Sequence, residues 1–318
     1  MSLPTLVMMI GLPGSGKSHL AKSYKAMGYN VHSSDEIREE LSGDVNRQDI
    51  NTDVFNLLHK RIKEDLSNGI SCVYDATNMS YKRRMGFLDQ IKGIRCWKKA
   101  MFVATPYEVC LERNDDRERK VPEFVIERMY RKFDPPYYYE GWNEIEVYYG
   151  DTAFKSAYKT PGTFIEHTMD YDQQNKYHSE TLGAHCLQCM EYVVDHYDED
   201  YVSQSFLTTL YSAACLHDCG KPFCQTFKDA KGKDCDSAHY YDHEHIGGYN
   251  IFFYDMPMVD KLYASVLVRW HMQMHFIDKQ PHTQEKYKNL FGYALWRDLT
   301  YLHKGDLKAH SSTMQYEC

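Results

Sequence analysis

The feature that most constrains the fold is a phosphate-binding loop near the start of the sequence. The residues Gly11-Leu-Pro-Gly-Ser-Gly16-Lys17-Ser18 follow the apolar run TLVMMI at once. They match the pattern G-x-x-x-x-G-K-[ST] in the strand–loop–helix context that this loop requires. The glycines let backbone N–H groups turn inward around phosphates at the positive end of the next helix. The first part of the chain is therefore predicted to be an α/β domain with a parallel sheet flanked by helices.

The same loop predicts a nucleotide cofactor and assigns a role to each of its residues. We expect Lys17 to reach the β and γ phosphates and the Ser18 hydroxyl to hold Mg²⁺. The residues whose backbone should surround the phosphates of ATP or another nucleoside triphosphate are Gly11, Gly14, Ser15 and Gly16. A P-loop identifies the donor, however, and leaves the acceptor of a phosphate open.

A second strand, expected over residues 29–32, points to the acceptor. It ends at Ser33-Ser34-Asp35, before a helix that carries Arg38. Ligands of a parallel sheet bind beyond the carboxyl ends of its strands, so Asp35 should face the phosphate loop. Asp35 is then a candidate base for an attacking hydroxyl, and Arg38, one turn on, a candidate clamp for an anionic substrate. The alternative is that Ser34 or Asp35 only caps the helix.

Two further segments complete the first half. A third strand, residues 71–74, runs into DATNMSYKRR, which suggests a basic track over Lys82, Arg83 and Arg84. The polar segment LERNDDRERK then places several cations together. Charge runs are often only solvated surface, but phosphoryl transfer needs cations around the γ phosphate, commonly from a closing lid. The cations of that segment are Arg113, Arg117, Arg119 and Lys120.

Taken in order, GLPGSGKS, SSDEIR, DATN…RR and RNDDR…VP…ERMY resemble the 5′-hydroxyl polynucleotide kinases of phage and bacterial nucleic-acid repair enzymes, over roughly residues 4–150. The resemblance implies that Asp35 is the general base and that Arg38 binds the acceptor's phosphate. It also implies that Arg113 and Arg117 lie on the lid, with Arg117 on the donor phosphates. One departure concerns the acidic residue directly before TN, where this chain has Ala76 and Asp75 comes one position earlier.

Charge and histidine content divide the sequence into two halves. Residues 1–150 contain 22 Lys and Arg and 22 Asp and Glu, whereas the remaining 168 contain 15 and 23, which accounts for the whole net charge of −8. Three histidines precede residue 150 and 13 follow it. At 318 residues two domains are favoured. We predict a kinase-like domain over residues 1–155, a linker over 156–175 and an all-helical domain over 176–318.

The second half is marked by the stretch CLHDCGKPF, residues 215–223. His217 and Asp218 follow an apolar helical run and precede a Gly-Lys-Pro breaker. Neighbouring side chains on a helix diverge by about 100°, so the two can reach one ion only where the helix ends. Imidazole and carboxylate ligands suit divalent transition metals as well as Mg²⁺ or Mn²⁺.

The arrangement YHSETLGAHCL…LHDCGKP…YDHEHIGG…RWHMQMH…LHKGDLKAH resembles the HD phosphohydrolase superfamily over roughly residues 176–310. The resemblance implies one or two divalent ions, with Mn²⁺, Ni²⁺, Co²⁺, Fe²⁺ or Mg²⁺ as candidates. It also implies that Lys221 assists phosphate binding. The implied ligands of the first ion are His185, His217, Asp218 and Asp306, and His243 and His271 match the extra histidines of two-metal members. His178, His245 and His275 lie near these positions but out of register.

Both resemblances together predict a bifunctional nucleic-acid end-healing enzyme. It would phosphorylate 5′-OH ends with ATP and remove a 2′,3′-cyclic phosphate or a 3′-phosphate, as in the repair of cleaved tRNA. The expected partners are single-stranded or nicked RNA or DNA ends and a separate RNA ligase. One alternative is a small-molecule kinase fused to an HD nucleotide phosphohydrolase, which the zero charge of the first half permits. Another is an HD half that only binds or senses a ligand.

Cellular location is predicted from what the sequence lacks. No apolar stretch approaches the roughly 18 residues of a membrane span, and no secretory signal precedes the first strand. The ten cysteines show no disulfide framework. CLQC, residues 186–189, has a zinc-like spacing without a second pair, which we interpret as two faces of one helix. These features predict a cytoplasmic protein of a bacterial or phage-infected cell.

Overall fold

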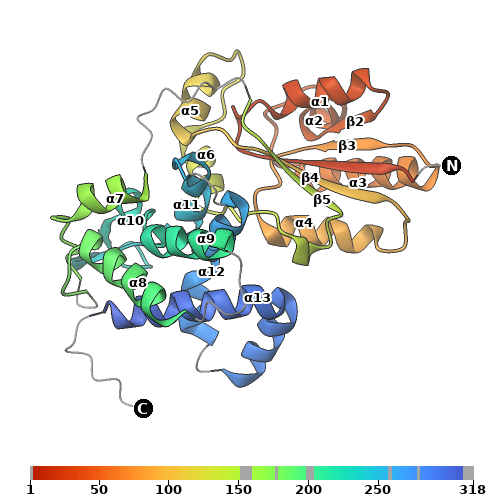
Figure 1. The fold of residues 1–318 in the computed structure, drawn as a ribbon. Coiled ribbons are helices and arrows are strands. Elements are labelled where there is room, and N and C mark those ends of the chain that lie inside the picture. The colour runs from red at the N-terminus through yellow and green to blue at the C-terminus, as the bar shows by residue number, and fades with distance from the viewer. Residues whose placement is uncertain are drawn as a thin grey trace. The chain divides into compact units, whose positions relative to one another are not determined.

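The computed structural model describes residues 3–150, 160–175, 178–197, 204–256, 260–277 and 280–310. Within them the chain divides into two compact units (Figure 1). The first contains residues 3–130 and 136–150, and the second contains residues 131–135 and 160–310. The short segment 131–135 thus belongs to the second unit, although the first unit surrounds it in sequence.

A five-stranded parallel sheet forms the centre of the first unit. Its strands are β1 (Thr5–Ile10), β2 (Asn30–Ser33), β3 (Cys72–Asp75), β4 (Trp97–Val103) and β5 (Glu144–Tyr148), in the order β2-β3-β1-β4-β5. The central strand β1 is almost wholly buried, as expected for a strand covered on both faces. The second and third strands lie one residue further along than the sequence predicts. Because all strands are parallel, their carboxyl ends meet at one edge.

Helices cover both faces of this sheet. They are α1 (Lys17–Ala26), α2 (Ser34–Ser42), α3 (Asn51–Ser67), α4 (Tyr81–Leu88), α5 (Tyr107–Asp115) and α6 (Glu123–Tyr130). Figure 1 shows α1 on one side of the sheet and α4 on the other. Right-handed crossovers require this arrangement. The connection from β1 to β2 moves toward one edge of the sheet, and the connection from β3 to β4 moves toward the other edge. Ala21 and Tyr24 of α1 pack on Val7 and Val73, which form part of the core. The predicted α/β fold with a parallel sheet is confirmed.

The second unit is helical, as expected, with one small hairpin. Its elements are α7 (Pro161–Thr168), α8 (Leu182–His196), α9 (Gln204–Leu216), α10 (Lys221–Cys224), β6 (Thr226–Lys228), β7 (Asp234–His239), α11 (His243–Asn250), α12 (Lys261–Ile277) and α13 (Pro281–Lys308). Helix α8 packs against α9 and α13, and α12 packs against α11 and α13. Within α13 the backbone leaves helical geometry at Gly292, whose φ is 74°.

The segment predicted as a linker, 156–175, contains α7. The Thr160 hydroxyl caps this helix by accepting a hydrogen bond from the Thr163 N–H. Helix α7 packs so closely on α8 that a Cβ on Gly183 would lie 2.6 Å from the carbonyl oxygen of Ile165. Residues 161–168 are therefore part of the helical packing, and residues 151–159 lie outside the described ones.

Phe133 shows how the segment 131–135 is held in the second unit. Its ring is fully buried and lies edge-on against Tyr249 and Phe252. The neighbouring Asp134 accepts a hydrogen bond of 2.6 Å from Arg269. This segment supplies part of the second unit's core, which the sequence pattern did not predict. In the part of the chain that the structure describes, no helix has the length and apolar character needed to cross a membrane.

Candidate active sites

The phosphate loop lies at the carboxyl end of β1 and has the backbone that its glycines permit. Gly11, Gly14 and Gly16 have φ values of 154°, 88° and 98°. Gly14 is required for space as well, because a Cβ there would lie 2.3 Å from the carbonyl oxygen of Cys110. The Thr105 hydroxyl donates to the carbonyl of Ser15 across the same edge. The backbone N–H groups that the sequence assigned to phosphates thus stand at the start of α1.

Lys17, Ser18 and Asp75 come together beside this loop. Lys17 Nζ donates to the Leu12 carbonyl at 2.7 Å, and Ser18 lies close enough to Asp75 to lower the pKa of its carboxyl. Asp75 is the last residue of β3 and is only 5% exposed. Burial raises its pKa, and the charge of Lys17 partly offsets that effect. The sequence left the role of Asp75 uncertain; its place at a strand end was the available signal.

Asp35 does not cap α2, which was the alternative interpretation of this residue. The side chain of Ser33 caps α2 by accepting a hydrogen bond from the Asp35 N–H. The Asp35 carboxylate, about half exposed, instead receives Arg38 Nη1 at 2.8 Å on one oxygen and Arg119 Nη1 at 2.7 Å on the other. The sequence predicted that Arg38 lies on the same side as Asp35, and this ion pair agrees. Arg38 also donates to Asn51 at 2.8 Å.

The arginine-rich segment after α5 is held in shape by Asn114. The Asn114 side chain donates to the Val121 carbonyl and accepts from the Val121 N–H, both at 2.9 Å. Burial lowers the pKa of Lys17, and Arg117 is close enough to add to that effect. Arg119 faces Asp35, whereas Arg113 lies exposed in the last turn of α5. The segment therefore brings cations to both the donor and the acceptor side of the loop.

The predicted basic track of Lys82, Arg83 and Arg84 is corrected at Arg84. That side chain is fully buried and forms two hydrogen bonds of 2.7 Å with the carboxylate of Glu140. It also donates to the carbonyl of Asn78. Arg84 holds the loop after β3 in place and cannot meet a substrate, while Lys82 and Arg83 are exposed.

The second candidate site begins where α9 ends. The helix stops at Leu216, so His217 and Asp218 fall in the turn before α10, as their adjacency requires. The turn approaches α11 so closely that a Cβ on Gly220 would lie 2.1 Å from the His243 carbonyl oxygen. Any larger residue would push the His243 backbone away. The Gly-Lys-Pro breaker thus sets the distance between two of the helices that supply histidines.

Donor atoms converge at this turn at the spacing of a coordination sphere. His185 Nε2 lies 3.1 Å from His217 Nε2, 3.3 Å from Asp218 Oδ2 and 3.1 Å from Asp306 Oδ1. His217 Nε2 lies 3.4 Å from Asp218 Oδ2 and 3.6 Å from Asp306 Oδ1. Ligand atoms about 2.1 Å from one ion are roughly 3.0 to 3.4 Å apart. The four residues named from the sequence therefore fit a bound divalent ion.

The other ring nitrogens explain why a cation is needed there. His185 Nδ1 faces the Ala309 carbonyl at 3.1 Å and His217 Nδ1 faces the Ala214 carbonyl at 2.8 Å. A carbonyl only accepts, so each Nδ1 carries a proton and each Nε2 points at the other ring. Two Nε2 atoms that face each other beside two carboxylates need positive charge between them, from a bound ion or from ring protons. Such carbonyl contacts orient metal-binding histidines in known sites.

The same geometry recurs on the other side of Asp218. His243 Nε2 lies 3.3 Å from His271 Nε2 and 3.1 Å from Asp218 Oδ1. The Nδ1 atoms of both rings again face carbonyls, those of Tyr240 and Val268. Asp218 thus presents one oxygen to each histidine pair, which is the arrangement of a carboxylate that bridges two ions.

Burial and charge act in opposite directions in this cluster. All six residues are no more than 5% exposed. Burial alone would raise the pKa of Asp218, but Lys221 and His217 hold it well below its usual range. Burial alone would lower the pKa of His217, but the charge of Asp218 holds it well above its usual value. The carboxylates therefore attract positive charge to the point where the Nε2 atoms meet.

Residues near the cluster take other positions. His245 Nδ1 contacts the Phe133 carbonyl at 2.7 Å, so this near-miss histidine contributes to packing. His275 Nε2 contacts Asp306 Oδ2 at 2.7 Å, from the far side of that carboxylate. Cys186 and Cys189 lie on one buried face of α8, not on two faces, because three residues span nearly one turn. Burial raises the pKa of both thiols.

Comparisons with known proteins agree with the first of the two sites. A family model described as an AAA domain matches residues 6–136. The L-seryl-tRNA(Sec) kinase of Methanococcus maripaludis is 29% identical over 137 residues, which are 41% of this chain and 53% of that protein. The chain thus spans about half the length of that curated relative. The first unit has the α/β P-loop kinase fold.

Solved structures resemble part of this chain. A chain of the Pnkp1/Rnl/Hen1 RNA repair complex shares 22% identity over 41% of this chain and 43% of its own, with a TM-score of 0.36. A gluconokinase from Sinorhizobium meliloti shares 18% identity over 46% of this chain and 83% of its own, with a TM-score of 0.33.

Proposed function

We propose that this chain is a bifunctional enzyme that heals nucleic-acid ends. The first unit would transfer phosphate from ATP to a 5′-OH end, and the second would remove a 2′,3′-cyclic phosphate or a 3′-phosphate. The observation that carries the proposal is that one chain contains two separate groups of side chains suited to phosphate chemistry. One is an ATP loop with the carboxylate of Asp35 at the same sheet edge, and the other is a buried cluster with the donor spacing of a metal centre. The relative named for a tRNA kinase supports an RNA acceptor.

In the kinase reaction, the acceptor oxygen bonds to the γ phosphorus while the bond to the β–γ bridging oxygen breaks. The hydroxyl proton goes to Asp35, whose carboxylate lies at the carboxyl edge of the sheet, and ADP leaves. Lys17 and Arg117 neutralise charge on the transferred group. Ser18 and Asp75 would hold Mg²⁺, which neutralises the donor phosphates when bound. Arg38, which is fixed by Asp35 and Asn51, would clamp a phosphate of the acceptor.

In the second unit, His185, His217, Asp218 and Asp306 would hold one divalent ion, and His243, His271 and Asp218 a second. Such ions lower the pKa of water and polarise phosphorus–oxygen bonds when bound. The protein's own contribution is to orient the four Nε2 atoms, because the Nδ1 of each ring contacts a backbone carbonyl. Assignment of this unit to the HD superfamily is part of the proposal.

The test supplies the purified full chain with ATP and each of Mn²⁺, Ni²⁺, Co²⁺ and Mg²⁺. The substrates are oligonucleotides with a 5′-OH and either a 2′,3′-cyclic phosphate or a 3′-phosphate, in RNA and DNA versions. We expect phosphate at the 5′ end and loss of phosphate at the 3′ end. If metal-loaded protein leaves every 3′ end unchanged, the phosphohydrolase function is wrong.

A second candidate function is a small-molecule kinase fused to a nucleotide phosphohydrolase. The burial of Arg84 favours it, because the basic track expected over Lys82, Arg83 and Arg84 loses one of its three cations. A free nucleoside offered beside a 5′-OH oligonucleotide separates the two functions. Preference for the nucleoside would replace the end-healing proposal.

A further inference from the structure

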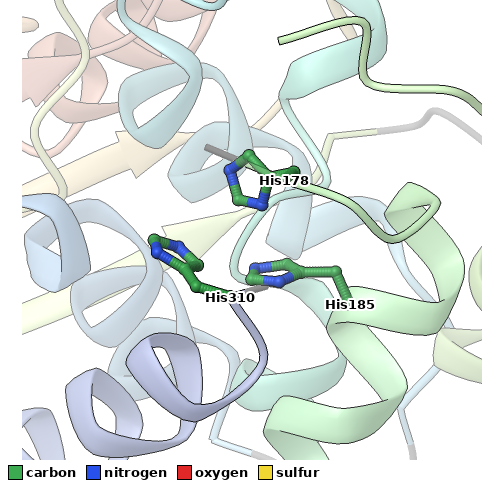
Figure 2. A group of neighbouring side chains, drawn as sticks. All are labelled: His178, His185 and His310. Carbon is green, nitrogen blue, oxygen red and sulfur yellow. The ribbon is translucent and has the colours of Figure 1, made fainter. Parts of the chain in front are cut away.

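A further group of histidines adjoins the metal cluster and shares His185 with it. Figure 2 shows the rings of His178, His185 and His310 turned toward one another. The ring centroid of His178 lies 4.7 Å from that of His185 and 4.7 Å from that of His310. His185 comes from α8, His178 from the loop before it and His310 from the chain just after α13. The nitrogens of the three are close enough for one ion.

Their hydrogen bonds argue against an ion at this place. His185 directs Nε2 at the metal cluster and Nδ1 at the Ala309 carbonyl, so neither nitrogen is available. His178 Nε2 lies 3.1 Å from Lys221 Nζ, a cation that would repel a metal. This group therefore suits a different kind of ligand.

Lys221 determines what His178 offers. An ammonium has three N–H donors and cannot accept. Lys221 uses all three, on Asp218 Oδ2 at 2.7 Å, Gln173 Oε1 at 2.7 Å and His178 Nε2 at 3.1 Å. It is 4% exposed, so no donor remains for a phosphate. The direct role in phosphate binding that the sequence resemblance implies for Lys221 is thus not available to it in this arrangement.

The contact with Lys221 leaves His178 with one donor that has no partner. Because Lys221 donates, His178 Nε2 accepts, and the ring proton is on Nδ1. His178 Nδ1 is buried and has no hydrogen-bond partner among the described residues. Leaving a buried donor unsatisfied costs about 1–3 kcal/mol. Gln173 keeps the arrangement fixed, because its Nε2 donates to the Glu180 carbonyl and its Oε1 must face Lys221.

The ring of His178 adjoins the ligands of the first metal position, with its centroid 4.7 Å from that of His185. Lys221 contacts Asp218 Oδ2, the same oxygen that faces His185 and His217. His310 Nε2 lies 3.3 Å from Asp306 Oδ1, the oxygen that faces the same two histidines. An oxyanion here would have one oxygen near the metal ligands and another within the His178 group.

We propose that His178 is a phosphate-binding residue whose Nδ1–H donates to a non-bridging oxygen of the substrate's phosphate ester. Lys221 is the positioning residue that fixes the tautomer of His178. The inference rests on the proposed phosphohydrolase function and names the part of the site that recognises the oxyanion. It predicts a phosphate subsite that is separate from the metal ligands.

The test compares His178→Phe with His178→Asn in the full chain. Phenylalanine removes the donor, whereas the asparagine side chain keeps an N–H close to the place of Nδ1. We expect His178→Phe to raise the KM for a 3′-phosphorylated oligonucleotide and the inhibition constant of inorganic phosphate by roughly 10- to 100-fold. His178→Asn should stay close to wild type. Metal content, measured by mass spectrometry of the purified protein, should be unchanged in both. His196→Phe is the control, since His196 is exposed and its contacts with the Tyr192 carbonyl and the Tyr192 ring stay within its own helix.

Lys221→Met gives a second measurement. It removes the cation that holds the tautomer, so phosphate inhibition should weaken and its pH profile should change, which a purely structural role would not produce. Equal phosphate inhibition in wild type and His178→Phe would overturn the inference, as would loss of one metal equivalent in His178→Phe. If wild type hydrolyses no phosphate ester, but phosphate binding by ³¹P NMR still depends on His178, the subsite stands and the proposed hydrolase function fails.

Discussion

The two candidate sites differ most in their exposure to solvent. In the first unit, Ser18 is exposed and the Asp35 side chain is 54% exposed. In the second, His185 and His217 are fully buried and Asp306 is 4% exposed. The first site consists of loops at the ends of parallel strands, whereas the second lies among helices α8, α9, α11, α12 and α13.

This difference indicates what each site needs from its ligand. An exposed carboxylate and a backbone loop are stable in water, so the kinase site can stand open until a nucleotide arrives. A buried cluster of imidazoles and carboxylates is costly unless its charges are balanced. If the second site binds the proposed ions, they should contribute to the stability of its unit, whereas the first site is not expected to contribute in this way.

The largest expected effect is that of Asp218→Ala, which removes the carboxylate that both histidine pairs share. Phosphohydrolase activity should fall below detection, and metal content should fall with it. Because Lys221 loses its buried counter-ion, unfolding of the second unit should become easier by about 3–5 kcal/mol. Activity assays, metal analysis and thermal unfolding measure these effects. Kinase rates serve as the control, and hydrolysis that survives Asp218→Ala would mean that the site lies elsewhere.

The corresponding change in the open site is Asp35→Ala. It should lower kcat for 5′-OH phosphorylation by about 10²- to 10⁴-fold, which is the usual contribution of a general base. Stability should hardly change, since the carboxylate is exposed. Lys17→Ala tests the donor side in the same assay, with an expected loss of about 10²- to 10³-fold. A normal kcat in Asp35→Ala would remove the general-base assignment.

Phe133→Ala tests whether the stability of the second unit depends on the segment 131–135. Phe133 is fully buried against Tyr249 and Phe252 of the second unit, so its truncation should destabilise that unit by about 3–5 kcal/mol. Chemical denaturation followed through phosphohydrolase activity measures it. The matched control is Phe124→Ala, because Phe124 is 68% exposed and should change stability by no more than about 0.5 kcal/mol. A fragment that begins at residue 160 lacks Phe133 and should show the same loss of stability, whereas equal stability would contradict the assignment of this segment.

The pH dependence of the first unit's stability should follow the protonation of His59. Burial between Tyr74 and Phe87 lowers the pKa of His59 to about 4. Below about pH 6.5 the unfolded chain takes up a proton on His59 and the folded chain does not. The free energy of unfolding is therefore highest above pH 6.5 and decreases as the pH falls toward 4. The loss should be on the order of 1–2 kcal/mol, allowing for partial exposure of the ring. Urea unfolding of His59→Gln should show a flatter profile, while the exposed His19→Gln should not.

Arg119→Ala should have the smallest effect. The pair of Arg119 with Asp35 is exposed enough to contribute only about 0.2–1 kcal/mol, so KM for the acceptor should change by less than about fivefold. Lys120→Ala, on the same segment and exposed, is the control. A loss as large as that of Asp35→Ala would make Arg119 part of the catalytic machinery and would contradict the comparison of an open site with a buried one.

Sequence motifs predicted the structure best where the geometry depends on residues that are close together in the chain. The phosphate loop is one such case, because three glycines, a lysine and a serine in eight positions specify the backbone that surrounds a phosphate. The turn at His217 and Asp218 is another, since neighbouring helical side chains reach one ion only where the helix stops. For these residues the structure has the geometry that their order in the chain predicts.

Other features depended on tertiary contacts. Arg84 looked like a substrate-binding cation until Glu140, 56 residues away, was found against it. The Nδ1 contact of His185 with Ala309, which directs Nε2 at the metal cluster, spans 124 residues. The pairing of Lys221 with Gln173 and His178 joins residues more than 40 positions apart, and it decides which nitrogen of His178 carries the proton. A sequence can show that a side chain is able to donate or accept, but whether it is already satisfied depends on which distant group packing brings within hydrogen-bond reach.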